Sequence, residues 1–344
     1  MKRLLLLSVL VGGTMAGTPG CSKYRPILYV LQWENYFAAD TISNFEKEFG
    51  CQVVVTNFGS ADELRAKLDR VPSGYDVAFP SDEILPQLIE AGKLEKLDLS
   101  KIPDFKNIAS RFRGAPADPK NDYSLPYMWG TTGIAYNVKE VSPAPDSWKV
   151  LWEAKYVSRM TMLEDRREVF AAAMLANGDD PKNPTAETIE KAKKKLLERK
   201  PLAYGVPREK LIAGDYILSQ CYNGDASEAA ASDERKTDIA YVIPKEGGTL
   251  WFDSVTIPAK PKNRDLAHAF LNYLMRPAVS AAISNARFYA NPNELAQQHI
   301  RKEIRENPLI YPSEETLKRC YYLPPLAPAL RKKMDGAWEE VRGK

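Results

Sequence analysis

Trp251 and Asp253 lie two residues apart in residues 245–258, a stretch with the pattern of a Gly-Gly turn followed by a strand. Successive side chains of a strand point to opposite faces, so the spacing predicts the indole and the carboxylate on one face and Phe252 on the other. An aromatic face attracts a cation, and a carboxylate accepts charge-assisted hydrogen bonds from an ammonium group. The pair therefore suits amine binding, although one packed aromatic beside one solvated acid would give the same pattern.

Four further segments at strand or loop ends offer an aromatic residue, an acid, or both. They are residues 33–36 (WENY), 81–83 (SDE), 165–168 (DRRE) and 222–225 (YNGD). Ligands of α/β sheets bind at the carboxyl ends of the strands, so this recurrence in both halves of the chain indicates one shared site. Asp165 and Glu168 can lie on one face of a helix start. Acids are also common there because they complement the helix dipole.

Motifs of the common catalytic and metal centres are absent from the sequence. It has no G-x-S-x-G, P-loop or HExxH pattern, and its two histidines, His268 and His299, stand in charge-flanked helical stretches. We therefore expect no cofactor and no metal. An exported hydrolase that uses Asp165 and Glu168 is a weaker alternative, because carboxylates on one helix turn rarely straddle a substrate bond.

The elements that must position these residues begin with alternating strands and helices. We expect strands at 27–31, 51–56 and 75–80, with helices that end near residues 49, 70 and 91. Ser60 and Glu63 have the spacing of a capping box, and Ser81 is expected to cap the helix 82–91. This order predicts a parallel sheet covered by helices.

A long extended segment, residues 123–137, predicts a crossover into a second domain. Strands at 159–163 and 216–221 and a helix at 167–176 belong to that domain. At 344 residues the chain suits two domains, and 48 basic against 45 acidic residues argue against nucleic-acid binding.

The N-terminus has the pattern of a secretory signal over residues 1–20. Lys2 and Arg3 precede a short apolar run and small residues that lead to Cys21. We expect a periplasmic protein that a lipid on Cys21 anchors to the membrane, with plain secretion as the alternative. The pairing of the other cysteines, Cys51, Cys221 and Cys320, stays open.

In this order the motifs resemble those of the periplasmic spermidine/putrescine-binding proteins of ABC importers, across nearly the whole mature chain. The matching segments are 33–36, 75–77 with 80–81, 121–130, 165–170, 244–248, 251–254 and 289–293. The resemblance implies the α/β type II periplasmic-binding-protein fold, with two lobes and a ligand cleft between them. Lobe 1 would comprise 24–129 and 253–297, and lobe 2 would comprise 130–252 and 298–344.

The resemblance also implies a function and partners. A monomeric, non-enzymatic binding protein would hold a polyamine and deliver it to the transmembrane subunits of an ABC permease. Trp251 and Tyr222 would sandwich the methylene chain, while Asp165, Glu168 and Asp253 would hold amino groups. The full set of expected binding residues is Trp33, Glu34, Asn35, Tyr36, Ser81, Glu83, Asp165, Glu168, Tyr222, Trp251, Asp253 and Tyr289.

Three positions depart from the family pattern. Glu34 precedes Asn35 where a hydroxyl residue and then an acid are usual, Glu83 replaces an aromatic residue, and Leu323 stands where spermidine binders have Gln. The choice between a diamine and a triamine therefore stays open. The alternative function is a surface sensor or interaction protein on the same fold that no longer serves transport.

Overall fold

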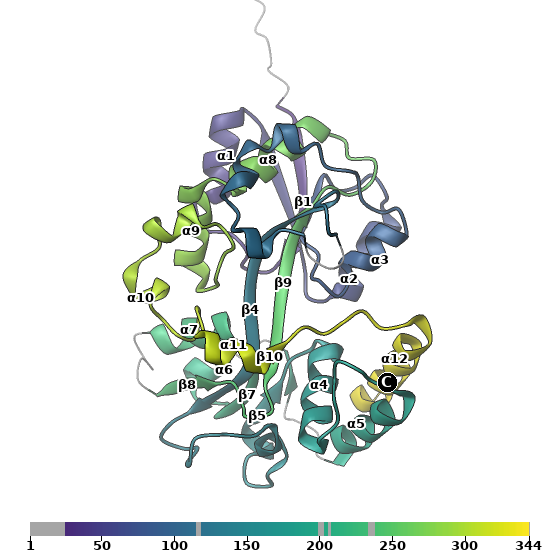
Figure 1. Cartoon of the computed structure of the whole chain (residues 1–344), viewed down its shortest axis with the longest axis vertical. Helices are drawn as coiled ribbons and strands as arrows, with labels where there is room; N and C mark the ends of the chain where they lie inside the picture. Colours follow the sequence, from purple (N-terminus) through teal and green to yellow (C-terminus); the bar gives the residue numbers. More distant parts are fainter. Residues whose placement is uncertain (1–24, 115–117, 199–202, 206–207, 233–237, 344) are drawn as a thin grey trace, which may run out of the picture.

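The computed structural model describes residues 25–343 except 115–117, 199–202, 206–207 and 233–237 (Figure 1). The expected signal segment 1–20 and the expected lipidation site Cys21 lie outside the described residues. No helix within the described residues is long and apolar enough to cross a bilayer.

The chain begins with the predicted alternation of strands and helices. The elements are β1 (Ile27–Trp33), α1 (Thr41–Phe49), β2 (Gln52–Phe58), α2 (Ala61–Arg70), β3 (Val77–Ala78) and α3 (Leu85–Glu90). The strand β1 lies between β2 and β3 and is parallel to both, which confirms the parallel arrangement. Ser60 caps α2 as expected, because its hydroxyl accepts a hydrogen bond from the Glu63 amide at 3.2 Å.

The prediction that Ser81 caps a helix over 82–91 is wrong. The helix α3 begins only at Leu85, and Ser81 instead pairs with Asp253 in an antiparallel bridge. The Asp82 amide donates to the Phe252 carbonyl at 3.0 Å, so the backbone here is used for sheet pairing. Ser81 is thus held in sheet pairing, and a turn over residues 82–84 separates it from the first residue of the helix.

Two long antiparallel strands join the two halves of the molecule. They are β4 (Ser124–Asn137) and β9 (Gly248–Thr256), and they run from the upper to the lower part of the molecule in Figure 1. β3 borders β9 on one side, and β7 borders β4 on the other. The predicted extended segment is thus a strand in the centre of one sheet, whose main order is β2-β1-β3-β9-β4-β7-β5-β6.

The remaining elements build the lower part and then return to the upper part. The lower part has β5 (Met160–Met162), α4 (Arg166–Asn177), α5 (Ala186–Glu198), β6 (Ala203–Tyr204), α6 (Arg208–Ala213), β7 (Leu218–Tyr222), α7 (Asn223–Ala231) and β8 (Ile239–Val242). After β9 come α8 (Arg264–Leu274), α9 (Pro277–Arg287), α10 (Lys302–Arg305), α11 (Glu314–Arg319), β10 (Cys320–Tyr321) and α12 (Pro328–Arg342). In Figure 1, α8 lies beside α1 in the upper part, and α12 lies beside α4 and α5 in the lower part.

Each part has its own apolar core. One core surrounds β1 and α8 and includes Leu28 and Phe270, and the other joins α4, α5 and α12 and includes Phe170 and Leu196. This division follows the expected order of segments, while the residue bounds of the two lobes stay a prediction.

The turn before β9 gives a test of how that strand is held. Gly247 has a φ of +96°, and a Cβ atom there would collide with the Arg319 carbonyl; Gly92 has a φ of +63° with no atom within 4 Å of a Cβ. Gly92→Ala should therefore cost about 1 kcal/mol for the left-handed backbone alone, and Gly247→Ala about 2–4 kcal/mol because a clash is added. Urea unfolding followed by tryptophan fluorescence measures both losses. Equal losses would contradict the close approach.

Candidate functional site

Asp253, in the middle of β9, is buried beside the turn that follows β1. The Tyr36 hydroxyl donates a hydrogen bond to its carboxylate, and the Tyr127 hydroxyl donates to the Tyr36 carbonyl at 2.7 Å. Burial raises the pKa of Asp253 to about 7, the negative charge of Asp165 adds to this, and the Tyr36 hydrogen bond opposes it. The strand therefore presents a carboxyl group whose negative charge lacks a cationic neighbour among these contacts.

A second carboxyl group comes from the first turn of α4. Asp165 is the N-cap of this helix and accepts from the amides of Arg167 at 2.8 Å and Glu168 at 3.3 Å. The buried Glu168 accepts from the Thr249 hydroxyl of β9 at 2.9 Å. Burial and the charge of Asp165 raise the pKa of Glu168 to about 8. The cap thus holds the Asp165 carboxylate, and Thr249 holds that of Glu168.

The loop between β3 and α3 adds two more acids. Burial and then the charge of Asp253 raise the pKa of Asp82 to about 7. The pKa of Glu83 is also raised to about 7, by burial first and then by the charge of Asp165, against the opposing charges of Arg167 and Arg166. These mutual effects place the acids in one electrostatic group, which we call the acid cluster. Its members are Asp82, Glu83, Asp165, Glu168 and Asp253.

Aromatic rings lie beside the acid cluster. The Trp251 ring meets Tyr222 and Tyr289 edge to face, with centroid distances of 5.7 and 5.4 Å. A methylene chain between two rings needs roughly 7 Å or more, because each carbon contact takes about 3.5–4.0 Å. In this arrangement Trp251 and Tyr222 therefore contact each other, and one of the rings must rotate before both could cover the same chain.

The four expected binding residues of segment 33–36, in the turn after β1, differ in their exposure to solvent. Tyr36 is buried at Asp253, and Trp33 is half-buried with its ring 4.5 Å from that of Phe58. Glu34 and Asn35 are exposed, and Asn35 has a φ of +55° in the left-handed region. The structure thus brings Tyr36 to the acid cluster and leaves Glu34 and Asn35 at the surface of the turn.

Three residues of the site are absent from the sequence prediction. Asp82 stands between two expected residues, Ser81 and Glu83. Its carboxyl group and its place in that segment would have been enough to include it among the expected binding residues. Thr249 and Tyr322 give no such signal, since they reach Glu168 and Asp82 through long-range contacts of β9 and the segment before α12.

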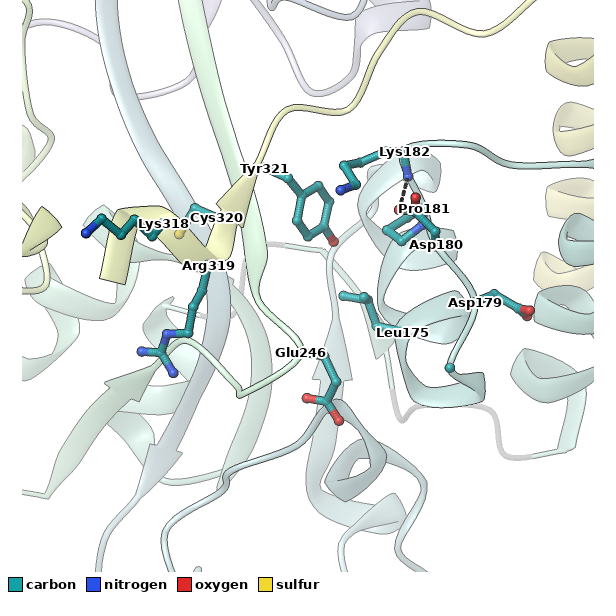
Figure 2. A pocket seen from close by; sticks show the side chains of 11 residues that line it. Leu175, Asp179, Asp180, Pro181, Lys182, Glu246, Lys318, Arg319, Cys320 and Tyr321 are labelled. Atoms are coloured by element: carbon teal, nitrogen blue, oxygen red, sulfur yellow. Dashed lines mark hydrogen bonds between the residues drawn. The ribbon is translucent and has the colours of Figure 1, made fainter. Parts of the chain in front are cut away.

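A surface cavity of about 320 Å³ lies elsewhere, at the C-terminal end of α4 (Figure 2). Leu175, Asp180, Lys182 and Tyr321 are among its lining residues. The helix has 12 residues and so extends roughly 18 Å, which separates this cavity from Asp165 at the other end. Within the described residues no group of His, Cys, Asp and Glu has the arrangement to hold a metal ion. The acid cluster is therefore the candidate site.

Comparison with known proteins gives one family and a consistent set of relatives. The family model described as "Bacterial extracellular solute-binding protein" matches residues 40–312. The putrescine-binding periplasmic protein SpuD of Pseudomonas aeruginosa is 33% identical, with 99% of each chain covered. The putrescine-binding periplasmic protein PotF of Escherichia coli is 34% identical over 99% of this chain and 98% of its own.

A solved structure supports the same relationship. The structure titled "Putative spermidine/putrescine ABC transporter from Listeria monocytogenes" is 29% identical and superposes with a TM-score of 0.87. The match covers 92% of this chain and 99% of the other.

The raised pKa values predict how stability depends on pH. Four carboxyls of the acid cluster have pKa values of about 7 to 8 in the folded protein, against about 4 in an unfolded chain. Between pH 4 and pH 7 the folded protein therefore binds more protons than the unfolded one, so its free energy of unfolding should increase as the pH falls through 7. The melting temperature should be higher at pH 5.5 than at pH 8 in purified protein without added ligand.

The matched variant is Glu168→Gln, which removes the carboxyl with the pKa of about 8. Its melting temperature should change less between the two pH values than that of the unaltered protein. A melting temperature that falls on acidification in the unaltered protein would contradict the burial of these acids.

Proposed function

The chain belongs to the bacterial extracellular solute-binding proteins, and we propose that it binds a polyamine in the periplasm and delivers it to an ABC permease. The family prediction and the predicted α/β periplasmic-binding-protein fold are confirmed by the family match and the solved relatives. SpuD and PotF are named as putrescine-binding proteins, and other relatives are named as spermidine/putrescine-binding proteins.

The observation that carries the proposal is a group of five acids beside aromatic rings, in which Glu168 and Asp253 are buried and Asp82, Glu83 and Asp165 are partly buried. A polyamine combines ammonium groups with apolar methylene chains, so it needs both kinds of contact. Carboxylates such as Asp253 and Glu168 accept its ammonium hydrogen bonds, and the faces of Trp251 and its neighbours cover the methylenes. The ligand binds best to the closed arrangement of the two lobes and so increases its population.

Further parts of the proposal rest on the sequence and the family. The lobes have the bounds 24–129 with 253–297 and 130–252 with 298–344. A signal segment over residues 1–20 directs export, a lipid on Cys21 anchors the protein, and the protein works as a monomer. The proposal includes no catalysed reaction, because the matching family and the relatives are solute-binding proteins.

The alternative on the same fold is a sensor or interaction protein without a transport role. Two residues that depart from the family pattern motivate it: Glu83 already has an arginine partner, and Leu323 is an apolar residue with 9% exposure. The binding measurements below separate the two functions.

A thermal-shift panel tests the ligand class. Putrescine, cadaverine and spermidine should raise the melting temperature in a concentration-dependent way, because a ligand of the native state stabilises that state. Arginine and glutamate should not, since their carboxylates meet the acid cluster with like charge. A panel without any polyamine shift, together with a protein partner in a pull-down, would favour the sensor function.

Asp253 gives the sharpest test of the site. Asp253→Asn keeps the size of the side chain and removes its charge, so polyamine affinity should fall by about 2 kcal/mol or more, which is roughly 30-fold in Kd. Isothermal titration calorimetry measures the change, and circular dichroism confirms the fold. The matched control is Asp265→Asn, which alters an exposed acid of α8 that forms an ion pair with Lys101. Unchanged affinity in Asp253→Asn would exclude this site.

A further inference from the structure

Arg166 is a largely buried cation at the first position of α4, where a positive charge is unfavourable. Its side chain is 11% exposed. The N-terminus of a helix carries a partial positive charge, so an arginine there needs acids close by. Three acids provide that charge, and each comes from a different segment of the chain.

Two of the three acids belong to the upper part of the molecule. Asp62, in the first turn of α2, forms an ion pair with Nη1 of Arg166. Glu83, in the loop between β3 and α3, has its Oε1 3.6 Å from Nη2. The Asp62 pair joins residues 104 positions apart, and Figure 1 shows α2 above and α4 below the middle of the molecule. Arg166 therefore reaches from the lower part to the upper part.

The third acid binds the last helix to the same arginine. Oδ1 of Asp335 on α12 lies 2.8 Å from Nε of Arg166. Of these three contacts, the one with Asp62 is a hydrogen bond, and those with Glu83 and Asp335 are ion pairs without hydrogen-bond geometry. Arg166 thus holds α12 and α4 of the lower part against α2 and the β3–α3 loop of the upper part.

A second contact between the same elements lies beside this one. Nη1 of Arg331 on α12 donates to Oε1 of Gln87 on α3 at 2.6 Å. The amide nitrogen of Gln87 donates in turn to the Glu83 carbonyl at 3.1 Å. The side chain of Glu83 therefore pairs directly with Arg166, and its carbonyl group is linked through Gln87 to Arg331. Both arginines belong to the lower part.

Glu83 needs these arginines because its other charged neighbours are acids. Asp165 and Asp82 both disfavour its negative charge, while Arg167 and Arg166 favour it. A buried carboxylate without its cation loses this compensation and is strongly destabilised. The charge of Glu83 is thus engaged by the protein itself.

We propose that Arg166 is a latch that holds the two lobes closed through Asp62 and Glu83, and that Glu83 belongs to this latch instead of binding an amine of the ligand. The effect on ligand affinity rests on the proposed function, whereas the effect on lobe closure does not. A latch raises the population of the binding-competent state before ligand arrives, and the measured Kd is inversely proportional to that population.

Small-angle X-ray scattering of the protein without added ligand tests the latch itself. Arg166→Gln should increase the radius of gyration, because the lobes lose the ion pairs that join them. Arg276→Gln is the matched control, since Arg276 forms an ion pair with Glu48 between α9 and α1 within the upper part. An unchanged radius in Arg166→Gln would overturn the proposal. Should that variant unfold, Asp62→Asn removes a half-exposed partner and should open the lobes in the same direction.

Calorimetry of a double-mutant cycle tests the role of Glu83. If both residues form the latch, Arg166→Gln and Glu83→Gln should each raise the polyamine Kd roughly fivefold or more, and the double variant should be no weaker than the weaker single one. If Glu83 instead holds an ammonium group, Glu83→Gln should weaken binding while Arg166→Gln strengthens it, and this result would overturn the assignment. Absence of binding in the unaltered protein would contradict the proposed function and leave the scattering test intact.

Discussion

The structure depends on one electrostatic constraint, the burial of like charges at the junction of its two parts. Two unit charges 4 Å apart interact with about 4 kcal/mol at an effective dielectric constant of 20, so a cluster of carboxylates is costly unless cations enter it. The pKa values of Asp82, Glu168 and Asp253 are raised first by burial and then by the charge of a neighbouring acid, and protonation relieves both costs because it removes the charge. A polycation removes the same cost by a different route, with its ammonium groups in place of the protons. Binding of a polyamine at the proposed site would therefore be linked to the release of protons.

The strand β9 sets the distance between the two sides of the acid cluster. Asp253 is held by Tyr36 from the upper part, and Thr249, four residues earlier on the same strand, is bonded to Glu168 of α4. A strand rises about 3.4 Å per residue, so these two points lie roughly 14 Å apart along a rigid element. β4 pairs with β9 over this whole length, which keeps the spacing independent of the loops. The frame is thus more rigid than the side chains it presents.

The sequence predicts the parts of the site that depend on local pattern. The alternation around Trp251, the spacing of Asp165 and Glu168, and the succession of strands and helices in the first segment are predictions from the periodicities of strands and helices. The prediction that Ser81 caps a helix fails because the local sequence has the pattern of a helix cap, whereas the backbone of Ser81 pairs with a strand more than 170 residues away. Long-range pairing overrides local propensity, and a single sequence does not reveal it.

Arg166 illustrates the same limit for charges. A run of two arginines beside two acids predicts local ion pairs or a solvated helix start. The partners of Arg166 are instead Asp62, Glu83 and Asp335, which come from three distant segments. The sequence alone suggests that Glu83 is an additional acid for the ligand. In the folded protein, Glu83 instead forms an ion pair with Arg166.

The start of α4 brings two acids of the proposed binding site and one inter-lobe contact into four consecutive residues, 165–168. Asp165 is the extended N-cap of the helix, and its charge acts on both Glu168 and Glu83. Arg167 donates to the Pro324 carbonyl at 2.8 Å, and Arg166 reaches the upper part. A ligand that draws Asp165 and Glu168 toward its ammonium groups therefore acts on the same rigid turn that carries the inter-lobe ion pairs. Coupling between binding and closure needs no relay through the protein, because both arise at one helix end.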